Sequence, residues 1–380
     1  MKSEQQIYSL AQGWKKKSDS NLSSTANLVL LFGNREILKQ EKPILEIRSQ
    51  YPNAEVVGCS TSGDFCGNEI YENHIVATAV WFEKTKIKIL TEEINNMDES
   101  FDIGEKLANR FDKTRLVHVM VLSEGLNING SHLTAGLNKG FENKVTITGG
   151  LAGDENKFEE TVIIYNSPGV RNKILAIGFY GEHIKIGYGS IGGWTSFGVD
   201  REITRSKGNI LFELDGQPAL QLYKRYLGDY ASSLPASGLL FPLSLKLRDK
   251  DTSLVRTVLA VNEEAGSMTF AGDVPQGEYV RLMQSNSEKL IEGAACAAEL
   301  SLSHLGQEQP DLAILISCLG RKLVLKQRAD EEPDIIQETF GLGTTLAGFH
   351  SYGEICPIGE GFLSCELHNQ TMTITAFKEY

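Results

Sequence analysis

Three glycine-rich segments of this 380-residue chain combine residue types that could bind a small molecule. Each follows a short apolar run that predicts a strand, and each ends in an acid. Glycine allows positive φ or a close approach to the main chain, so such a turn can offer backbone N–H groups to a ligand. Because the design occurs three times, we predict that the loops form one shared pocket. The segments are Gly58-Cys59-Ser60-Thr61-Ser62-Gly63-Asp64, Gly149-Gly150-Leu151-Ala152-Gly153-Asp154 and Gly348-Phe349-His350-Ser351-Tyr352-Gly353-Glu354.

The acid that closes each loop argues against a phosphate cradle. A phosphate-binding loop needs a lysine and a Ser or Thr after its second glycine, at a helix N-terminus. An acid in that place repels phosphate and suits an amine, a hydroxyl or a helix N-cap. The alternative for each loop is an ordinary strand-ending turn whose acid braces the backbone. The loop residues expected to contact a ligand are Cys59, Ser60, Thr61, Ser62, Gly150, Asp154, His350, Tyr352 and Glu354.

His350 differs from the other histidines because it lies inside the third loop, between Phe349 and Tyr352. An imidazole there could donate a hydrogen bond to a ligand or coordinate haem iron. His118, by contrast, has the pattern of a core residue on a strand. His350 is therefore the candidate metal ligand.

Arg321 directly follows the strand-ending run Ser317-Cys318-Leu319-Gly320. This position suits a carboxylate clamp, because a guanidinium pairs bidentately with a carboxylate. With Glu354 or Asp154 supplying the opposite charge, the pair would suit an amino-acid zwitterion or a haem propionate. The alternative is an internal ion pair between arginine and glutamate.

Cys59 and Cys318 lie where strands end, and a helix N-terminus there could lower a thiol pKa and create a nucleophile. Buried, inert thiols are the commoner case. The six cysteines contain no Cys-x-x-Cys pair, which disfavours structural zinc. The loop at Gly58 also lacks the Gly-x-Ser-x-Gly spacing of a serine hydrolase. Without a secretory segment, the thiols are expected to be reduced and the protein cytoplasmic.

Trp194 ends the glycine-rich run that begins at Gly187. It could cover a flat apolar ligand, or it could be a core plug, since large aromatic side chains dominate cores.

The formal charge of -12 argues against nucleic acid or an anionic membrane as the main partner. No apolar run approaches the roughly 20 residues that a membrane span needs. In the first 20 residues, Ile7, Leu10, Ala11 and Trp14 recur at helical spacing before a lysine run, which predicts a surface helix.

The order of the predicted elements indicates an α/β (mixed α+β) fold with two domains, each a mixed sheet with flanking helices. Residues 27–58 read as a strand, a helix and a second strand, and further strands and helices alternate up to the second loop. Strands without intervening helices follow residue 160. The predicted domains are residues 1–216 and 217–380.

Six motifs, in order, resemble the signature of the FIST sensory proteins, as a FIST N domain followed by a FIST C domain. The resemblance covers most of the chain. The motifs are Val57-Gly58-Cys59-Ser60-Thr61-Ser62-Gly63, Gly149-Gly150-Leu151-Ala152-Gly153-Asp154, Leu214-Asp215-Gly216-Gln217-Pro218-Ala219, Ser317-Cys318-Leu319-Gly320-Arg321, Gly348-Phe349-His350-Ser351-Tyr352-Gly353-Glu354-Ile355 and His368-Asn369-Gln370-Thr371.

The resemblance implies a signal-input module and not an enzyme. Because no kinase or cyclase segment is fused to the chain, it is most similar to the NosP-type branch, which binds haem b and senses nitric oxide for a partner histidine kinase. His350 stands where many relatives are expected to have an aromatic residue. An amino-acid sensor and a thiol-dependent hydrolase that uses Cys59 or Cys318 are the alternatives.

Overall fold

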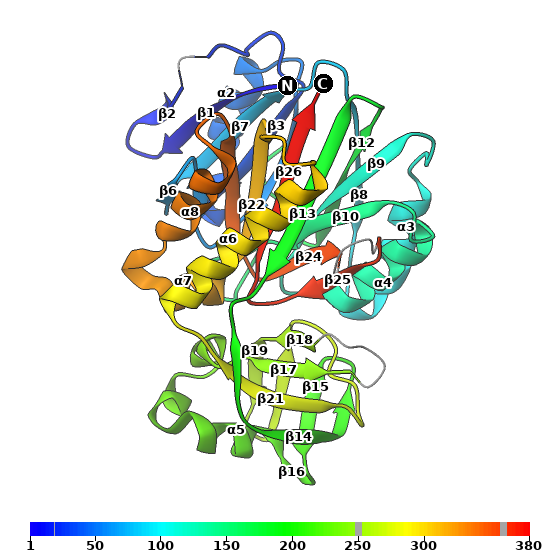
Figure 1. Cartoon of the computed structure of the whole chain (residues 1–380), viewed down its shortest axis with the longest axis vertical. Helices are drawn as coiled ribbons and strands as arrows, with labels where there is room; N and C mark the ends of the chain where they lie inside the picture. Colours follow the sequence, from blue (N-terminus) through cyan, green and yellow to red (C-terminus); the bar gives the residue numbers. More distant parts are fainter. Residues whose placement is uncertain (19, 248–252, 358–362) are drawn as a thin grey trace.

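A computed structural model describes residues 1–18, 20–247, 253–357 and 363–380. Figure 1 shows a larger body that contains both chain ends and, below it, a smaller body labelled β14 to β21 and α5. The sheets contain parallel and antiparallel strand pairs, and helices flank them. The mixed α/β class predicted from the sequence is therefore confirmed. Within the described ranges, no helix is long and apolar enough to cross a membrane.

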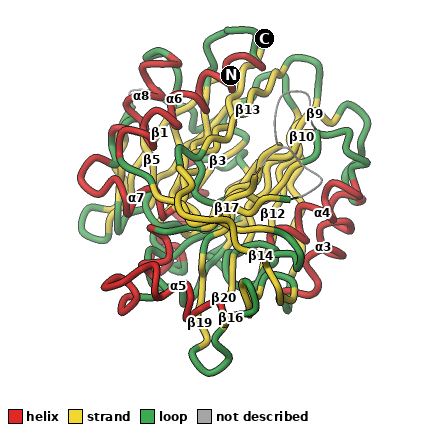
Figure 2. The backbone as a smooth tube through the Cα atoms, turned by 60° about the horizontal axis from the view of Figure 1, so that its bottom comes forward, coloured by secondary structure: helices red, strands yellow, loops and turns green. Residues whose placement is uncertain are grey.

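The larger body consists of three repeats with one strand plan. Along each sheet, the first strand of a repeat pairs with its last strand, and the last pairs with an inner strand. That inner strand pairs in parallel with the strand that enters a glycine loop. Figure 2 shows helices at the periphery and strands in the middle.

The first repeat contributes the order β4-β3-β7-β1-β2 to its sheet. Its elements are β1 (Lys2–Ser9), β2 (Gly13–Lys16), β3 (Leu28–Gly33), α1 (Arg35–Leu38), α2 (Glu41–Gln50), β4 (Glu55–Ser60), β5 (Asp64–Cys66), β6 (Glu69–Tyr71) and β7 (Ile75–Trp81).

The second repeat contributes the order β10-β9-β12-β8. Its elements are β8 (Lys86–Glu93), the 3-10 helix η1 (Met97–Glu99), α3 (Ser100–Asn109), β9 (Leu116–Ser123), α4 (Gly130–Gly140), β10 (Thr146–Leu151), β11 (Ile163–Tyr165) and β12 (Lys173–Tyr180).

The third repeat contributes the order β13-β26-β22-β23. Its elements are β13 (Ile184–Ile191), α6 (Ser287–His304), β22 (Leu312–Cys318), α7 (Leu319–Leu325), η4 (Lys326–Arg328), α8 (Glu331–Phe340), β23 (Thr345–Ser351), β24 (Gly353–Pro357), β25 (Cys365–His368) and β26 (Met372–Glu379).

The smaller body is inserted into the third repeat, between β13 and α6, and forms its own sheet. The predicted domain division at residues 216 and 217 falls inside this insert. Its elements are β14 (Thr195–Lys207), β15 (Ile210–Leu214), β16 (Gln217–Pro218), α5 (Ala219–Leu227), η2 (Gly228–Ser233), η3 (Ala236–Leu240), β17 (Leu243–Lys246), β18 (Ser253–Arg256), β19 (Val258–Asn262), β20 (Ser267–Phe270) and β21 (Tyr279–Gln284).

Each repeat also gives a strand to the sheet of another repeat. Strand β5 of the first repeat pairs with β23 of the third, and β24 of the third pairs with β10 of the second. Strand β11 of the second repeat pairs with β4 of the first, which closes the cycle. The exchanged strand always follows the glycine loop of its own repeat, so the exchange determines where the three loops lie.

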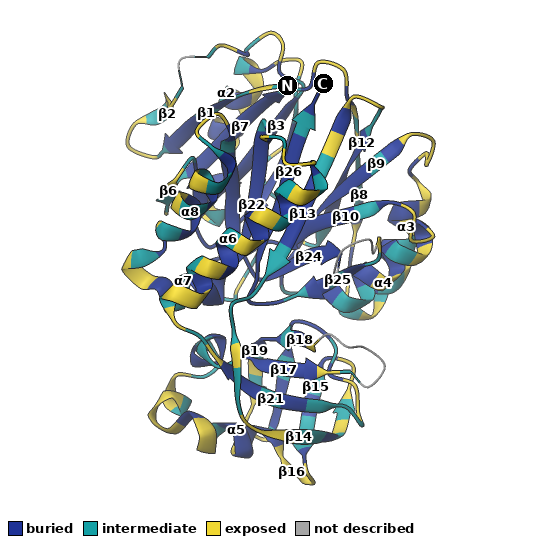
Figure 3. Cartoon of the chain, in the orientation of Figure 1, coloured by how far each residue is buried: buried dark blue, intermediate teal, exposed yellow. Residues whose placement is uncertain are grey.

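The inner strands are continuous apolar runs because both of their faces are covered. Strand β3 is buried along its whole length, as is β22. One face packs on the other two sheets in a shared core that includes Phe32, Leu122 and Phe349. Figure 3 shows buried strands beneath helices whose outer faces are exposed.

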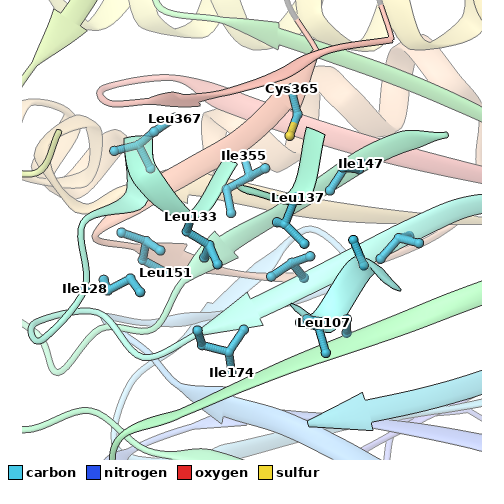
Figure 4. Packing of buried hydrophobic residues seen from close by; sticks show 14 of the residues in the cluster. Leu107, Ile128, Leu133, Leu137, Ile147, Leu151, Ile174, Ile355, Cys365 and Leu367 are labelled. Atoms are coloured by element: carbon cyan, nitrogen blue, oxygen red, sulfur yellow. The ribbon is translucent and has the colours of Figure 1, made fainter. Parts of the chain in front are cut away.

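A second core lies between the helices of the second repeat and its sheet. Leu107 of α3 and Leu137 of α4 pack there with Ile147 of β10. Ile355 and Leu367 of the third repeat also belong to this cluster (Figure 4). Repeats are therefore joined by side-chain packing as well as by strand exchange.

The predicted N-terminal surface helix is wrong. Residues 2–9 form β1 and residues 13–16 form β2. Strand β1 pairs with β7, so the free edge of a sheet decides its conformation over local helical spacing. Ile7 and Tyr8 are both buried in this arrangement.

Candidate functional site

The first glycine of each loop is required for close approach of two strands. Gly58 pairs with Leu31, Gly149 with Val121 and Gly348 with Leu315 across the parallel strand pairs. An added Cβ would lie 1.7, 1.9 and 1.9 Å, respectively, from the carbonyl oxygens of these partners. These glycines therefore serve strand packing, which their spacing in the sequence does not distinguish from ligand contact.

The three loops meet, as the sequence predicts, in a closed ring of backbone hydrogen bonds. Ser62 N donates to His350 O at 2.9 Å, and Gly153 N donates to Ser60 O at 2.9 Å. Tyr352 N donates to Leu151 O at 3.2 Å and completes the ring.

The ring changes what the loops can offer to a ligand. His350 N donates to Gly63 O, Thr61 N to Gly33 O and Ala152 N to Ser123 O. The expectation that these backbone N–H groups bind a ligand is wrong, because they donate to another loop or to the ends of the neighbouring strands β3 and β9. Any ligand must be bound mainly by side chains.

Asp64 and Glu354 occupy equivalent places, and each accepts from a hydroxyl three residues earlier. Thr61 Oγ1 donates to Asp64 at 2.6 Å, and Ser351 Oγ donates to Glu354 at 2.5 Å. Burial raises the pKa of Asp64 to about 8, although the Thr61 hydrogen bond and Lys322 oppose it. Burial likewise raises the pKa of Glu354 to about 7. Both carboxyls can therefore hold a proton near neutral pH.

Asp154 braces its own loop, which is the alternative considered from the sequence. It accepts from the backbone N–H groups of Phe158, Glu159 and Glu160 at 2.9 to 3.0 Å. Arg35 pairs with it at 2.8 Å. The Tyr352 hydroxyl also donates to it.

His350 is fully buried, with 0% of its surface exposed, and neither ring nitrogen has a hydrogen-bond partner among the described residues. The ring lies against Phe65, with centroids 4.6 Å apart. Burial, reinforced by Lys322, lowers its pKa well below the usual value, so the imidazole is neutral. A neutral imidazole has one donor and one acceptor, and leaving a buried polar group unpaired costs about 1–3 kcal/mol.

Lys322 is the cation beside His350. A Cβ on Gly63 would lie 2.8 Å from Lys322 Nζ and 3.2 Å from His350 Nδ1, so Gly63 separates the two groups. The ammonium donates to Ser62 O at 2.7 Å and pairs with Glu72 at 2.5 Å. Its side chain is 17% exposed, which makes it the part of this cluster that reaches solvent.

Asn369 and Gln370 supply further unpaired polar atoms in the turn before β26. Asn369 Oδ1 and Nδ2 and Gln370 Oε1 have no hydrogen-bond partner in the described part of the chain, and both residues are 0% exposed. Gln370 Nε2 donates to Leu239 O of the insert at 2.9 Å. This turn therefore lies where the two bodies meet.

Arg321 forms the internal ion pair that the sequence leaves open. It is 0% exposed and pairs with Glu332, also 0% exposed, at 2.5 Å. Its remaining N–H groups donate to the carbonyls of Gly192, Ile191 and Leu290. The guanidinium has no donor directed at Glu354 or Asp154 as a ligand clamp.

The two candidate nucleophiles are buried thiols. Burial raises the pKa of Cys59 well above its usual value, and Asp64 adds to the effect. Burial also raises the pKa of Cys318, although this residue caps the N-terminus of α7. The expected lowering of the pKa by a helix end is therefore outweighed by desolvation.

The other predicted contact residues have structural partners. Ser60 Oγ accepts from Val162 N at 3.0 Å, and Ser62 Oγ donates to Glu155 O at 3.2 Å. Gly150 pairs with Glu354 across β10 and β24. The Trp194 indole donates to Gln370 O at 2.9 Å, and the half-buried ring packs on an apolar cluster.

The immediate surroundings of His350 do not fit a porphyrin as the side chains lie. The imidazole fits iron by chemistry, since both nitrogens are unpaired. However, haem needs an open face at one nitrogen, and a fully buried ring beside Phe65, Gly63 and Lys322 offers none unless these residues move. Within the described ranges, no group of three or more His, Cys, Asp or Glu side chains could hold a metal ion.

Sequence reasoning missed Lys322 as a site residue and did not single out the side chains of Asn369 and Gln370. Lys322 directly follows Arg321, and Asn369 and Gln370 belong to one of the motifs that carry the family resemblance. Those motifs were the available signal. The position of Lys322 and the unpaired atoms of Asn369 and Gln370 depend on packing between distant segments, which no local pattern encodes.

Comparison with known proteins agrees with the motif pattern. The FIST N domain matches residues 27–217, and the FIST C domain matches residues 219–357. The uncharacterized protein MJ1623 of Methanocaldococcus jannaschii is 24% identical over a 354-residue alignment, and the match covers 81% of this chain. This chain spans 65% of that protein's length, less than two thirds.

Among solved structures, a cyanuric acid hydrolase from A. caulinodans aligns over 93% of this chain and 90% of its own, with 7% identity and a TM-score of 0.38. A score this low supports no conclusion about activity. The two domain matches together cover most of the chain. The chain belongs to the FIST family, whose domains are signal-transduction sensors for small ligands.

Proposed function

We propose that this chain senses a small carboxylate-bearing molecule, such as an amino acid, at His350 and Lys322. The signal would pass in trans to a separate signalling protein, for example a histidine kinase. The proposal depends on one observation, the fully buried imidazole of His350 with both nitrogens unpaired. Native proteins pair most buried polar groups, so this exception favours a ligand site at the ring.

Lys322 determines the class of ligand. It replaces Arg321 as the candidate cation, because Arg321 is bound by buried Glu332 and backbone carbonyls. The carboxylate paired with Lys322, by contrast, belongs to the exposed Glu72 and can be displaced by a ligand. A ligand carboxylate could accept from Lys322 while the neutral imidazole donates to it. The partly exposed Lys322 side chain also provides the direction of entry.

Haem b with nitric oxide is the second candidate, and the unpaired His350 nitrogens favour it. Its binding would require Phe65 or Lys322 to move. Addition of hemin to the protein would then produce a Soret band that shifts with nitric oxide and is absent from His350→Phe.

A receptor explains the site better than a hydrolase does. A thiol-dependent hydrolase needs a thiolate, and burial raises the pKa of both Cys59 and Cys318.

The direct test is a thermal-shift screen with the twenty amino acids and short carboxylic acids, on wild type and His350→Phe. A ligand at a hundred times its Kd stabilises the native state by about 2.7 kcal/mol. We expect at least one compound to raise the Tm of the wild type but not of His350→Phe. The control is His132→Gln, because His132 lies in α4 and pairs with Asp273, outside the site. An equal rise in wild type and His350→Phe would place the ligand elsewhere.

A further inference from the structure

A hollow lies at the opposite end of the larger body from the glycine loops. It is a cleft of about 660 Å³ lined by residues at the start of β8, before β9 and after β12. The loops follow the other end of the same sheet, since β10 runs parallel to β9. Figure 1 shows β8, β9 and β12 together on one side of the larger body. The volume lies within the range of small-molecule sites, about 300–1,000 Å³.

The lining of this cleft is basic in an acidic protein. Lys84, Lys86, Lys88 and Arg115 line it together with His183, against two acids, Asp112 and Glu182. The chain as a whole has a formal charge of -12. A local excess of positive charge in a hollow concentrates field lines and attracts anions.

The cations are weakly neutralised within the protein. Among the described side chains, the shortest ion pair of these four is Arg115 with Glu182, at 3.6 Å, and both members are more than 70% exposed. Lys84 Nζ donates to Tyr380 O, and Lys88 Nζ donates to Arg110 O. The Arg110 carbonyl is neutral and leaves the charge of Lys88 uncompensated.

Tyr180 is a further polar residue of the lining. Its hydroxyl oxygen is buried and has no hydrogen-bond partner in the described part of the chain, although the residue lines the cleft. Arg115 is held beside it in a left-handed backbone conformation, with φ of 59°, and Arg115 O accepts from Gly181 N at 3.1 Å. A residue other than glycine rarely adopts this conformation.

Protection of a sheet edge explains only part of this pattern. Strand β8 is an edge strand, and lysines on edge strands prevent aggregation. That role accounts for Lys86 and Lys88, which alternate with Ile87 along the strand. Edge protection does not explain the cleft itself, the contribution of Arg115 from a different segment or the unpaired hydroxyl of Tyr180.

We propose that this cleft binds a small anion with two or more phosphate groups. Lysine binds phosphate as a point charge and arginine binds it bidentately, so the four cations suit several phosphate oxygens. The Tyr180 hydroxyl then donates to one of them. Nucleotides and inorganic polyphosphates share this chemistry. The site is independent of the receptor at His350.

The test is calorimetric titration of the full chain with inorganic tripolyphosphate and, separately, with ATP at low salt. We expect saturable binding with one site per chain, weakened at least tenfold in K86Q/K88Q, since each lost charge-assisted hydrogen bond costs about tenfold. The matched control K42Q/R48Q removes two exposed charges from α2 and should bind as wild type does. Tighter binding of ATP than of tripolyphosphate would identify a nucleotide site, and the reverse a polyphosphate site.

Tyr180→Phe supplies a second readout that does not depend on net charge. Without ligand, its unfolding midpoint should equal or exceed that of the wild type, because an unpaired buried hydroxyl is lost. Its affinity for the better anion should fall several-fold. Absence of saturable heat, or equal weakening in K86Q/K88Q and K42Q/R48Q, would overturn the proposal. Unchanged affinity in Tyr180→Phe would remove Tyr180 from it.

Discussion

Asp64→Asn should make the free energy of unfolding less sensitive to rising pH. The Asp64 carboxyl is 1% exposed, and burial raises its pKa from 3.8 to about 8. The folded-state pKa therefore exceeds that of the unfolded chain. Between these two values the folded state binds more protons, so the free energy of unfolding falls as pH rises.

The size of the effect follows from the pH range that lies between the unfolded and folded pKa values of Asp64. Between pH 5 and pH 7 the folded Asp64 keeps its proton and the unfolded one has lost it. At 1.36 kcal/mol per pH unit, this group alone lowers the free energy of unfolding of the wild type by about 2.7 kcal/mol. Asparagine has nearly the same shape and does not titrate. The difference in stability between Asp64→Asn and wild type should therefore shift in favour of the variant by this amount.

Urea unfolding at pH 5, 6 and 7 measures the effect directly, because the free energy falls linearly with denaturant. Asp229→Asn is the control, since Asp229 lies exposed in the insert. Its stability relative to wild type should be nearly constant across the same range. If the curves for wild type and Asp64→Asn run parallel, Asp64 is ionised in the folded protein and the argument from burial is wrong.

Three further predictions test the packing of the loops and the chemistry of the thiols. Gly348→Ala should lower the free energy of unfolding by more than about 4 kcal/mol or prevent folding, because its Cβ would lie 1.9 Å from Leu315 O. Circular dichroism would measure the loss, and near-wild-type stability would contradict the strand contact. Glu332→Leu should cost about 3–5 kcal/mol by stranding Arg321, and R321M/E332L should recover part of that loss in urea unfolding. If the double variant is as unstable as the sum of both single variants, the pair is not coupled. Iodoacetamide should label the exposed Cys296 before the buried Cys59 or Cys318, and peptide mass spectrometry measures the order. Early labelling of Cys318 would instead support the thiol-dependent hydrolase.

Recurring local patterns were readable from the sequence. The three loops each combine a buried strand, a glycine and an acid, and this regularity correctly predicts that they meet. The buried runs of β3 and β22 identify inner strands for the same reason, because continuous apolar character reflects two covered faces.

Contacts between distant segments were not readable. The residues of β1 have helical spacing, but pairing with β7 some 70 residues later decides their conformation. The sequence position of Arg321 suits a ligand clamp, but α8 places Glu332 beside it and the two form an internal ion pair. The unpaired state of His350 is likewise a property of its neighbours, since Phe65 and Lys322 reach it from other parts of the chain.

The cyclic exchange of strands has a consequence for synthesis of the chain on the ribosome. Strand β5 cannot find its place beside β23 until residue 347 and those after it have emerged, and the Met1 amino group meets Glu379 at 3.2 Å. Contacts of such long range slow folding and leave unpaired edges exposed meanwhile. The insert pairs its strands within residues 195–284 and so can complete its sheet first. Nascent chains should therefore pass through a stage in which the insert is folded and the larger body is not. Chaperones are most needed at this stage.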